Sequence, residues 1–184
     1  MKTKTVSDCQ IIKLPLIKSD RKGSMTPVYN NKHIPFQIQR VYYLYDIPSG
    51  AERGGHAHKE LQQLIVSASG SFNVEVNDGK NKIKFKLDRP SYGLYLPPMI
   101  WRELKNFSGG AICLVLASLK YDENDYFRNY KEFIRNKWKH GEFRTIKGKV
   151  IEKGGIAFSN VIGKFPKEFA KKIPGTKGST AFWS

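Results

Sequence analysis

The chain has 184 residues, a hydrophobic fraction of 40% and a formal net charge of +16, which together suit one domain with a substantial core and room for an appendage. No apolar run reaches the roughly 18 residues of a membrane-spanning helix, and two cysteines are too few for a disulfide framework. The charge favours an anionic partner, but the Lys and Arg residues are spread along the chain without an Arg-rich arm, a zinc-finger spacing or an RNP-type motif, which argues against nucleic acid.

The chain begins with MKTKTVSDCQ, which lacks the apolar middle of a secretory signal, so we expect a cytoplasmic protein. From residue 36 to residue 119, short β segments alternate with turn residues. Asp78-Gly79 separates two of them and is a strong hairpin signal. The expected strands lie within residues 36–47, 61–70, 71–76, 82–87, 91–101 and 111–118. Many short strands without interleaved helices predict an all-β antiparallel sandwich or barrel, most simply a jelly roll.

After Ser118 the apolar residues recur at helical spacing. Asp122 is a plausible N-cap, and Phe127, Tyr130, Ile134 and Trp138 follow on one face, so one helix should pack against the sheet. Beyond His140 the sequence is basic and contains several glycines, which predicts an irregular tail. We expect a domain over residues 1–140 and a basic C-terminal extension of unknown role over residues 141–184.

The segment ERGGHAHKELQ carries two of the four histidines, His56 and His58. If this segment is extended, residues two apart project from the same face, so the two imidazoles would point together into the mouth of the barrel. Three interpretations follow: a metal site, a structural pair with satisfied hydrogen bonds, or an acid–base pair. Neutral imidazole near pH 7 suits the last of these.

The residues around the pair disfavour a metal. The segments HAHKELQ and GLYLPPMIWRELKN resemble the two sequence boxes of the cupin family, whose metal sites add a Glu after the second His and a further His from a later strand. Here Gln62 and Arg102 stand at those places. A guanidinium has no lone pair to offer a cation and would repel one, even if Glu60 supplied a substitute oxygen. The sequence therefore predicts no metal and favours acid–base chemistry.

Several blocks, in one order and spacing, resemble a particular cupin family, the dTDP-sugar 3,4-ketoisomerases. The blocks are IPFQIQRVYYLYDI, RGGHAHKELQQLIVSASGS, PSYGLYLPPMIWRELKNFS and CLVLASLKYDENDYFRNY, and the likeness runs from Ile11 to His140. The resemblance implies a cupin jelly-roll barrel that converts dTDP-4-keto-6-deoxy-D-glucose to a 3-keto-6-deoxyhexose with neither metal nor organic cofactor. It also implies a relationship to the 3,5-epimerases of the rhamnose pathway.

The resemblance also implies roles for individual residues. His56 matches the catalytic base that removes the C3 proton, and His58 would position it or share in the proton relay. Tyr42 would shuttle a proton between the sugar oxygens, although it could equally be one more aromatic residue in a strand. Arg102 would stabilise the enediolate. The expected substrate-binding residues are Lys22, Arg40, Arg53, Lys59, Gln63 and Trp101. Arg40, Arg53 and Lys59 are assigned to the diphosphate, and Trp101 to thymine stacking or to the core.

Two positions bear on the C4 configuration of the product. Arg102 is typical of the branch with gluco products, whereas Lys22, before Gly23, matches neither branch, so a galacto product stays an alternative. The resemblance further implies a homodimer with exchanged N-terminal strands and a place in 3-amino-3,6-dideoxyhexose synthesis for lipopolysaccharide or O-antigen. A binding-only cupin, a metal-dependent cupin and a nucleic-acid-binding protein are the competing functions.

Overall fold

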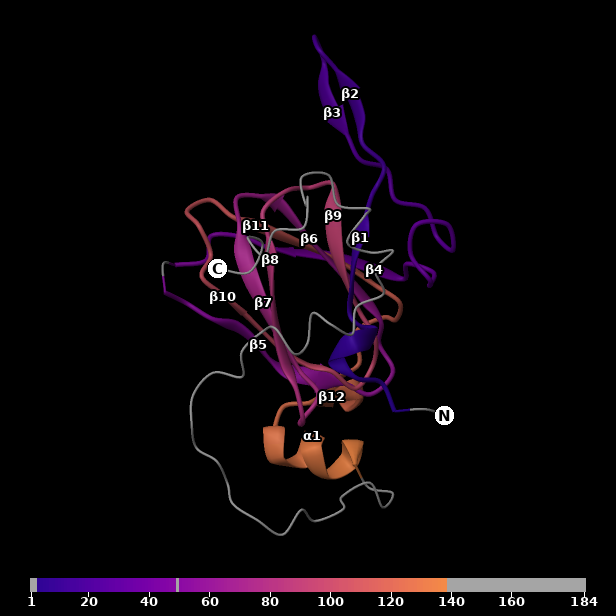
Figure 1. Cartoon of the computed structure of the whole chain (residues 1–184), viewed down its shortest axis with the longest axis vertical. Helices are drawn as coiled ribbons and strands as arrows, with labels where there is room; N and C mark the ends of the chain where they lie inside the picture. The colour runs from indigo at the N-terminus through magenta and orange to yellow at the C-terminus, as the bar shows by residue number, and fades with distance from the viewer. Residues whose placement is uncertain (1–2, 49, 139–184) are drawn as a thin grey trace, which may run out of the picture.

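A computed structural model describes residues 3–48 and 50–138, and it confirms the expected all-β jelly roll with one C-terminal helix (Figure 1). Two five-stranded antiparallel sheets face each other. The first sheet has the order β1 (Gln10–Lys13), β9 (Tyr92–Leu96), β6 (Gln63–Ser69), β11 (Ile112–Ala117) and β4 (Arg40–Leu44). The second has the order β12 (Tyr126–Phe127), β5 (Arg53–His58), β10 (Trp101–Lys105), β7 (Phe72–Asn77) and β8 (Lys82–Leu87).

The main core lies between the two sheets and follows from the period-2 pattern of the strands. In the β7–β8 hairpin, alternate residues are buried, as the sequence predicts. These are Phe72, Val74 and Val76 on β7 and Ile83, Phe85 and Leu87 on β8. The turn at Asp78-Gly79 is also confirmed, since Asn77 pairs with Lys82.

Some expected strands are shorter than their apolar pattern. Strand β4 begins only at Arg40, and the preceding Phe36 packs on the outer face of the first sheet beside Leu14 and Ile34. That face presents the apolar side chains Leu64, Val66 and Leu116 and needs a cover. The N-terminal segment supplies it, and β1 adds an edge strand that the sequence analysis did not predict.

The expected helix is wrong in its first turns. Asp122 caps only a short 3-10 turn, η2 (Glu123–Asp125), where its carboxylate accepts a hydrogen bond from the Asn124 amide. The chain then pairs with β5 as strand β12, which contains Phe127. The α-helix α1 (Tyr130–Lys137) begins later, with Asn129 as its N-cap. Strand pairing therefore overrides the helical periodicity over this stretch.

Helix α1 lies at one end of the sandwich and covers the outer face of β5 (Figure 1). Its Phe133 packs with Ala57, Trp101 and Phe127. Gly79 in the β7–β8 turn permits this approach, because a Cβ there would lie 2.4 Å from Ile134 Cδ1.

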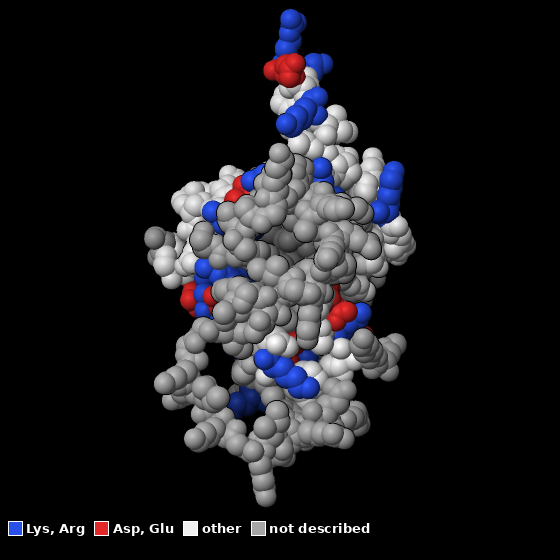
Figure 2. All heavy atoms as spheres, viewed as in Figure 1, with Lys and Arg blue, Asp and Glu red and all other residues white. Residues whose placement is uncertain are grey.

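At the opposite end a two-stranded arm, β2 (Ile17–Ser19) and β3 (Gly23–Met25), projects from the sheets (Figure 1). A short 3-10 turn, η1 (Val6–Asp8), precedes β1. The arm is exposed, and Figure 2 shows Lys and Arg side chains at its tip. The expected extension, residues 141–184, lies outside the described residues. Within residues 3–48 and 50–138, no helix has the length and apolarity needed to span a bilayer.

Candidate active site

Strand register brings four polar side chains together on the inner face of the second sheet. His56 and Arg102 are partners across the β5–β10 pair, and His58 and Tyr126 are partners across the β5–β12 pair. The two imidazole rings lie 5.1 Å apart at an interplanar angle of 89°. The Tyr126 ring lies 4.9 Å from that of His56 and 4.2 Å from that of His58. The expected pairing of the histidines on one face is therefore what the structure shows.

The glycines before the histidines fit this arrangement. Gly54 has a φ of +89°, and a Cβ on it would lie 2.8 Å from the backbone oxygen of Arg102. Gly55 also has a positive φ, +67°, and the β5–β10 register shifts beside it, between Arg102 and Glu103. The two glycines thus form a β-bulge that lets β5 approach β10 closely and aims His56 inward.

The first sheet faces this row with Tyr42 on β4 and Gln63 on β6. The amide nitrogen of Gln63 donates to the Tyr42 hydroxyl at 2.9 Å, and its amide oxygen accepts from Arg102 Nη2 at 2.9 Å. Arg102 Nη1 donates to the backbone oxygen of His56 at 3.2 Å. One chain of hydrogen bonds therefore joins both sheets across the site. Gln62, which stands at the place of the missing cupin glutamate, instead bonds Tyr95 Oη at 2.7 Å.

Arg102 is the principal charge of the site. Its side chain is only 3% exposed, and among the described residues it forms no ion pair with a carboxylate. Burial lowers the pKa of Arg102 to about 10, so the guanidinium stays cationic at neutral pH. A buried cation whose fixed partners are neutral is costly in the free protein and is prepared to meet an anionic ligand or intermediate.

Both histidines are neutral at physiological pH. Burial and the nearby Arg102 guanidinium lower the pKa of His56 to about 3. Burial, then Arg102 and His56, lower the pKa of His58 well below its usual range. Neutral imidazoles can accept a proton, which a base requires. Burial also raises the pKa of Tyr42, so its phenol keeps a proton to share.

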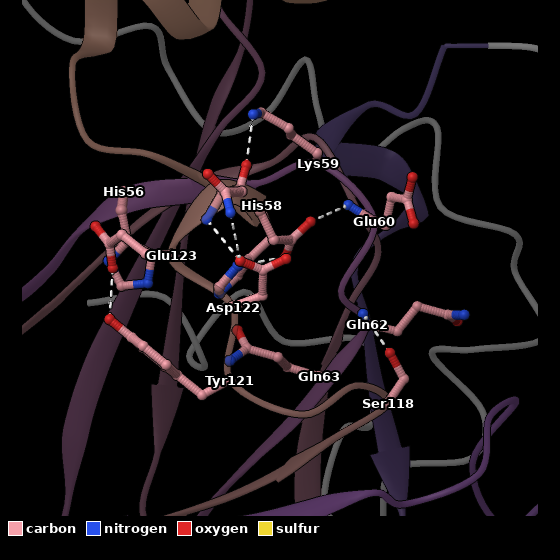
Figure 3. A network of polar contacts seen from close by, with 12 residues as sticks. His56, His58, Lys59, Glu60, Gln62, Gln63, Ser118, Tyr121, Asp122 and Glu123 are labelled. Carbon is pink, nitrogen blue, oxygen red and sulfur yellow. Dashed lines mark hydrogen bonds and ion pairs between the residues drawn. The ribbon is translucent and has the colours of Figure 1, made fainter.

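Asp125, which the sequence analysis missed, lies beside His58. Its Oδ2 is 2.8 Å from His58 Nδ1, although the two atoms are not aligned for a hydrogen bond. The other oxygen accepts from the Glu60 amide at 2.7 Å, and the Asp125 carbonyl accepts from the Lys59 amide at 2.8 Å. Figure 3 shows Tyr121, Asp122 and Glu123, from the segment before Asp125, alongside the histidines. The carboxylate favours the tautomer of His58 with its proton on Nδ1.

Arginines and tyrosines form the rim. Arg40 lies over the rings of Tyr42 and Tyr121, at 5.1 Å and 5.5 Å, and its buried Nε has no hydrogen-bond partner. Arg128, also missed from sequence, lies 4.5 Å from the Tyr126 ring. Its guanidinium contacts both carboxylate oxygens of Glu123, at 2.5 Å and 2.8 Å. The rim is thus cationic and aromatic, which suits a nucleotide diphosphate.

Four of the expected substrate-binding residues are not brought to this site within one chain. Trp101 lies in the core with Phe133, on the face of β10 opposite Arg102, which corrects the thymine-stacking interpretation in favour of the core. Lys59 faces away from the histidines, and its Nζ bonds the Asn124 carbonyl at 2.5 Å. Arg53 is exposed at the start of β5, and Lys22 lies at the exposed turn of the β2–β3 arm.

The donors present do not match a metal site. Residues 3–48 and 50–138 contain no group of three or more His, Cys, Asp and Glu side chains that could hold a metal ion. Arg102 would also oppose a cation beside the histidines.

Comparisons with known proteins agree with this geometry. The model of the FdtA family, described as WxcM-like, C-terminal, matches residues 7–138. A TDP-4-oxo-6-deoxy-alpha-D-glucose-3,4-oxoisomerase from Aneurinibacillus thermoaerophilus is 45% identical over 114 residues, which are 62% of this chain and 82% of that protein.

Two solved structures are similar to the chain over most of their length. A mutant of the 3,4-ketoisomerase QdtA from Thermoanaerobacterium thermosaccharolyticum, in complex with TDP-4-keto-6-deoxyglucose, has a TM-score of 0.70 at 37% identity, covering 73% of this chain and 96% of that one. The TDP-quinovose 3,4-ketoisomerase WlaRB from Campylobacter jejuni has a TM-score of 0.67 at 50% identity, covering 70% of this chain and 98% of that one.

Proposed function

The chain belongs to the FdtA family and is a sugar 3,4-ketoisomerase, and we propose that it converts TDP-4-keto-6-deoxyglucose to the TDP-3-keto-6-deoxyhexose by acid–base catalysis. The observation that carries this proposal is the neutral imidazole pair beside the buried, carboxylate-free Arg102. These are a base and a fixed cation, which the isomerisation needs. Two similar family members, whose names give this substrate, support the assignment.

The reaction moves a carbonyl by one carbon without a change in composition. His56 takes the proton from C3, and the electron pair of that bond forms the C3–C4 double bond while charge develops on O4. A proton then passes from O3 to O4, and a proton returns to C4 to leave the ketone at C3. His58, whose ring lies 5.1 Å from that of His56, would share the relay, with the Asp125 carboxylate beside its Nδ1 favouring one tautomer.

Arg102 and Tyr42 stabilise the intermediate. In a buried site a fixed guanidinium interacts more strongly with a developing oxyanion than it would in water. The Tyr42 hydroxyl is held by Gln63 and keeps its proton, so it can carry the oxygen proton from O3 to O4. Gln63 orients both residues through its amide and is itself 2% exposed.

The rim holds the TDP portion. Arg40, with an unpartnered buried Nε, is the residue best placed for the diphosphate, whereas Arg53 is exposed at the start of β5 and is not brought to the rim within one chain. Burial is the larger cause of the low pKa of His56 and would remain with substrate bound, but an anionic diphosphate would offset part of the effect of Arg102 and so strengthen the base.

The gluco configuration at C4 is the favoured product. Arg102 is typical of that branch, and the chain is 50% identical to a TDP-quinovose 3,4-ketoisomerase but 34% identical to the TDP-fucose-3,4-ketoisomerase WlaRA from the same organism. Quinovose is 6-deoxyglucose, so the higher identity supports the same assignment. Such a product suits the synthesis, in the cytoplasm, of an aminated deoxyhexose that is later used in a surface glycan.

Proton NMR of TDP-4-keto-6-deoxyglucose incubated with the purified protein tests the proposal. We expect loss of the 4-keto signals and appearance of a 3-keto sugar with a gluco C4 proton, unchanged by a chelator. No turnover, with TDP still bound, would support a binding-only cupin instead. Turnover abolished by the chelator, with metal in the purified protein, would support a metal-dependent enzyme.

We further propose a homodimer with exchanged N-terminal strands. Strand β4 is a sheet edge, its outward residues Val41 and Tyr43 are 54% and 60% exposed, and Tyr45 just after it is 59% exposed. The β2–β3 arm exposes Ile17 and Met25. An exposed edge and an unpartnered apolar arm are the features that strand exchange would cover, and exchange would place Lys22 near a neighbouring subunit. Light scattering should give a dimer mass, and Tyr43→Lys should shift it toward the monomer.

The domain division is also a proposal. The family match ends at residue 138, which supports a catalytic domain over residues 1–140 and a separate extension over residues 141–184. A chain ending at residue 140 should therefore retain turnover. A truncated chain that is folded but inactive would show that catalysis requires residues 141–184.

A further inference from the structure

Lys137, in the last turn of α1, is a buried cation that the proposed chemistry does not use. Its side chain is 6% exposed, although a lysine at the end of a surface helix normally extends into water. Among the described residues it forms no ion pair with a carboxylate. Its Nζ instead donates to two backbone carbonyls, that of Lys4 at 2.7 Å and that of Met99.

Met99 occupies an unusual backbone conformation. It follows Pro97-Pro98 in the loop between β9 and β10 and has a φ of +60°, in the left-handed region that non-glycine residues rarely adopt. Such a conformation costs free energy and persists only where surrounding contacts hold it. Lys137 supplies one such contact, because its Nζ donates a hydrogen bond to the Met99 carbonyl.

The same peptide segment reaches the histidine strand. The Met99 amide donates to the backbone oxygen of His58 at 2.7 Å. Met99 also packs against the hydrophobic cluster under α1, to which Ala57 belongs. Ala57 stands between His56 and His58 in the sequence, so the strand is held from behind at the residue that separates the two imidazoles.

We propose that Lys137 is a positioning residue for the catalytic histidines, acting through the Met99 turn. The path runs from the Lys137 ammonium to the Met99 carbonyl and from the Met99 amide to the His58 carbonyl. Removing the ammonium takes away one of the contacts that hold the left-handed turn, the Met99 amide that donates to the His58 carbonyl is then less firmly fixed, and the imidazole pair shifts relative to Arg102. Because proton transfer depends steeply on geometry, a small shift lowers kcat, whereas the TDP contacts on the rim are untouched.

This inference rests on the proposed ketoisomerase activity only for its kinetic readout. Lys137→Met keeps the aliphatic stem and removes the donors. We expect kcat to fall about tenfold to a hundredfold with KM changed less than about twofold. Lys131→Met, an exposed lysine of the same helix, is the matched control and should leave both constants unchanged. A Lys137→Met enzyme that is folded and retains wild-type kcat overturns the proposal.

A second measurement does not depend on activity. Hydrogen exchange of the Met99 amide should be about tenfold faster in Lys137→Met than in the wild type or in Lys131→Met. If Lys137→Met fails to fold, native-state hydrogen exchange of the wild-type protein in low urea tests whether Lys137 holds the Met99 turn. The amides of Met99 and Trp138 should then share one opening free energy. If α1 opens while the Met99 amide stays protected, Lys137 does not hold the turn. Absent turnover by the wild type would refute the proposed function and leave these exchange results to judge Lys137.

Discussion

Nδ1 of His58 lies 2.8 Å from Oδ2 of Asp125, a carboxylate delivered by the 3-10 turn that replaces the start of the expected helix. Asp125→Asn keeps the shape and the oxygen that accepts from the Glu60 amide, but it removes the charge that selects the His58 tautomer. We expect kcat to fall about tenfold to a hundredfold, with little change in KM, in a proton NMR assay. Asp122→Asn, which preserves the cap of the same turn, should keep wild-type kcat. Wild-type kcat in Asp125→Asn would remove this carboxylate from the relay.

His56→Asn should abolish removal of the C3 proton while the fold and TDP binding persist. Asn has roughly the reach of imidazole but no basic nitrogen at neutral pH. Exchange of the C3 hydrogen with deuterated water, followed by NMR, measures the step directly, and titration calorimetry with TDP measures binding. His33→Asn, in the loop before β4, is the control and should still exchange. Retained exchange in His56→Asn would exclude His56 as the base.

Arg102→Met should separate stability from activity. The variant removes a buried cation that has only neutral partners, at the cost of leaving the Gln63 amide oxygen without its donor. We expect a free energy of unfolding within about 1 kcal/mol of the wild type, because the two effects oppose each other. Turnover should fall at least about a hundredfold. Urea unfolding and NMR turnover give the two values. A variant that turns over normally would show that Arg102 does not stabilise the enediolate.

Acid should destabilise the protein through both histidines. His56 has a pKa of 6.5 when unfolded and about 3 when folded, so between these values the unfolded chain binds a proton that the folded chain does not. The free energy of unfolding therefore decreases as the pH falls from 6.5 toward 3, and His58 acts in the same direction.

Unfolding in urea at a series of pH values measures this slope. Each of His56→Asn and His58→Asn removes one group that binds a proton on unfolding, so each should reduce the slope of the unfolding free energy against pH by up to about 1.4 kcal/mol per pH unit. A pH dependence identical to the wild type in both variants would contradict the buried neutral state of the imidazoles.

The two glycines before the histidines should differ in their sensitivity to alanine. Both substitutions place an alanine at an unfavourable positive φ. In Gly54→Ala the new Cβ would in addition lie 2.8 Å from the Arg102 carbonyl oxygen, whereas a Cβ at Gly55 would enter open space. We expect Gly55→Ala to cost about 1 kcal/mol and Gly54→Ala about 3 kcal/mol, with a larger loss of turnover. If urea unfolding gave the same loss of unfolding free energy for both variants, β5 and β10 could separate to admit the Gly54→Ala methyl group without a cost in stability.

Much of the fold and part of the site follow from local sequence. The alternation in β7 and β8, the Asp78-Gly79 hairpin and the shared face of His56 and His58 all depend on the period of a strand, which is a property of a few neighbouring residues. The same period would also have excluded Trp101 and Lys59 from the site, because each is adjacent to a residue that faces it.

Only the tertiary structure decided which distant residues complete the site. Asp125 and Tyr126 lie in a stretch with helical periodicity, and their place beside the histidines depends on pairing between β12 and β5. Lys137 has no sequence signal that separates it from an exposed helical lysine, and its burial depends on where α1 meets the Met99 turn. Local pattern determines which face of a strand a side chain occupies, whereas register and packing between distant segments determine which faces meet.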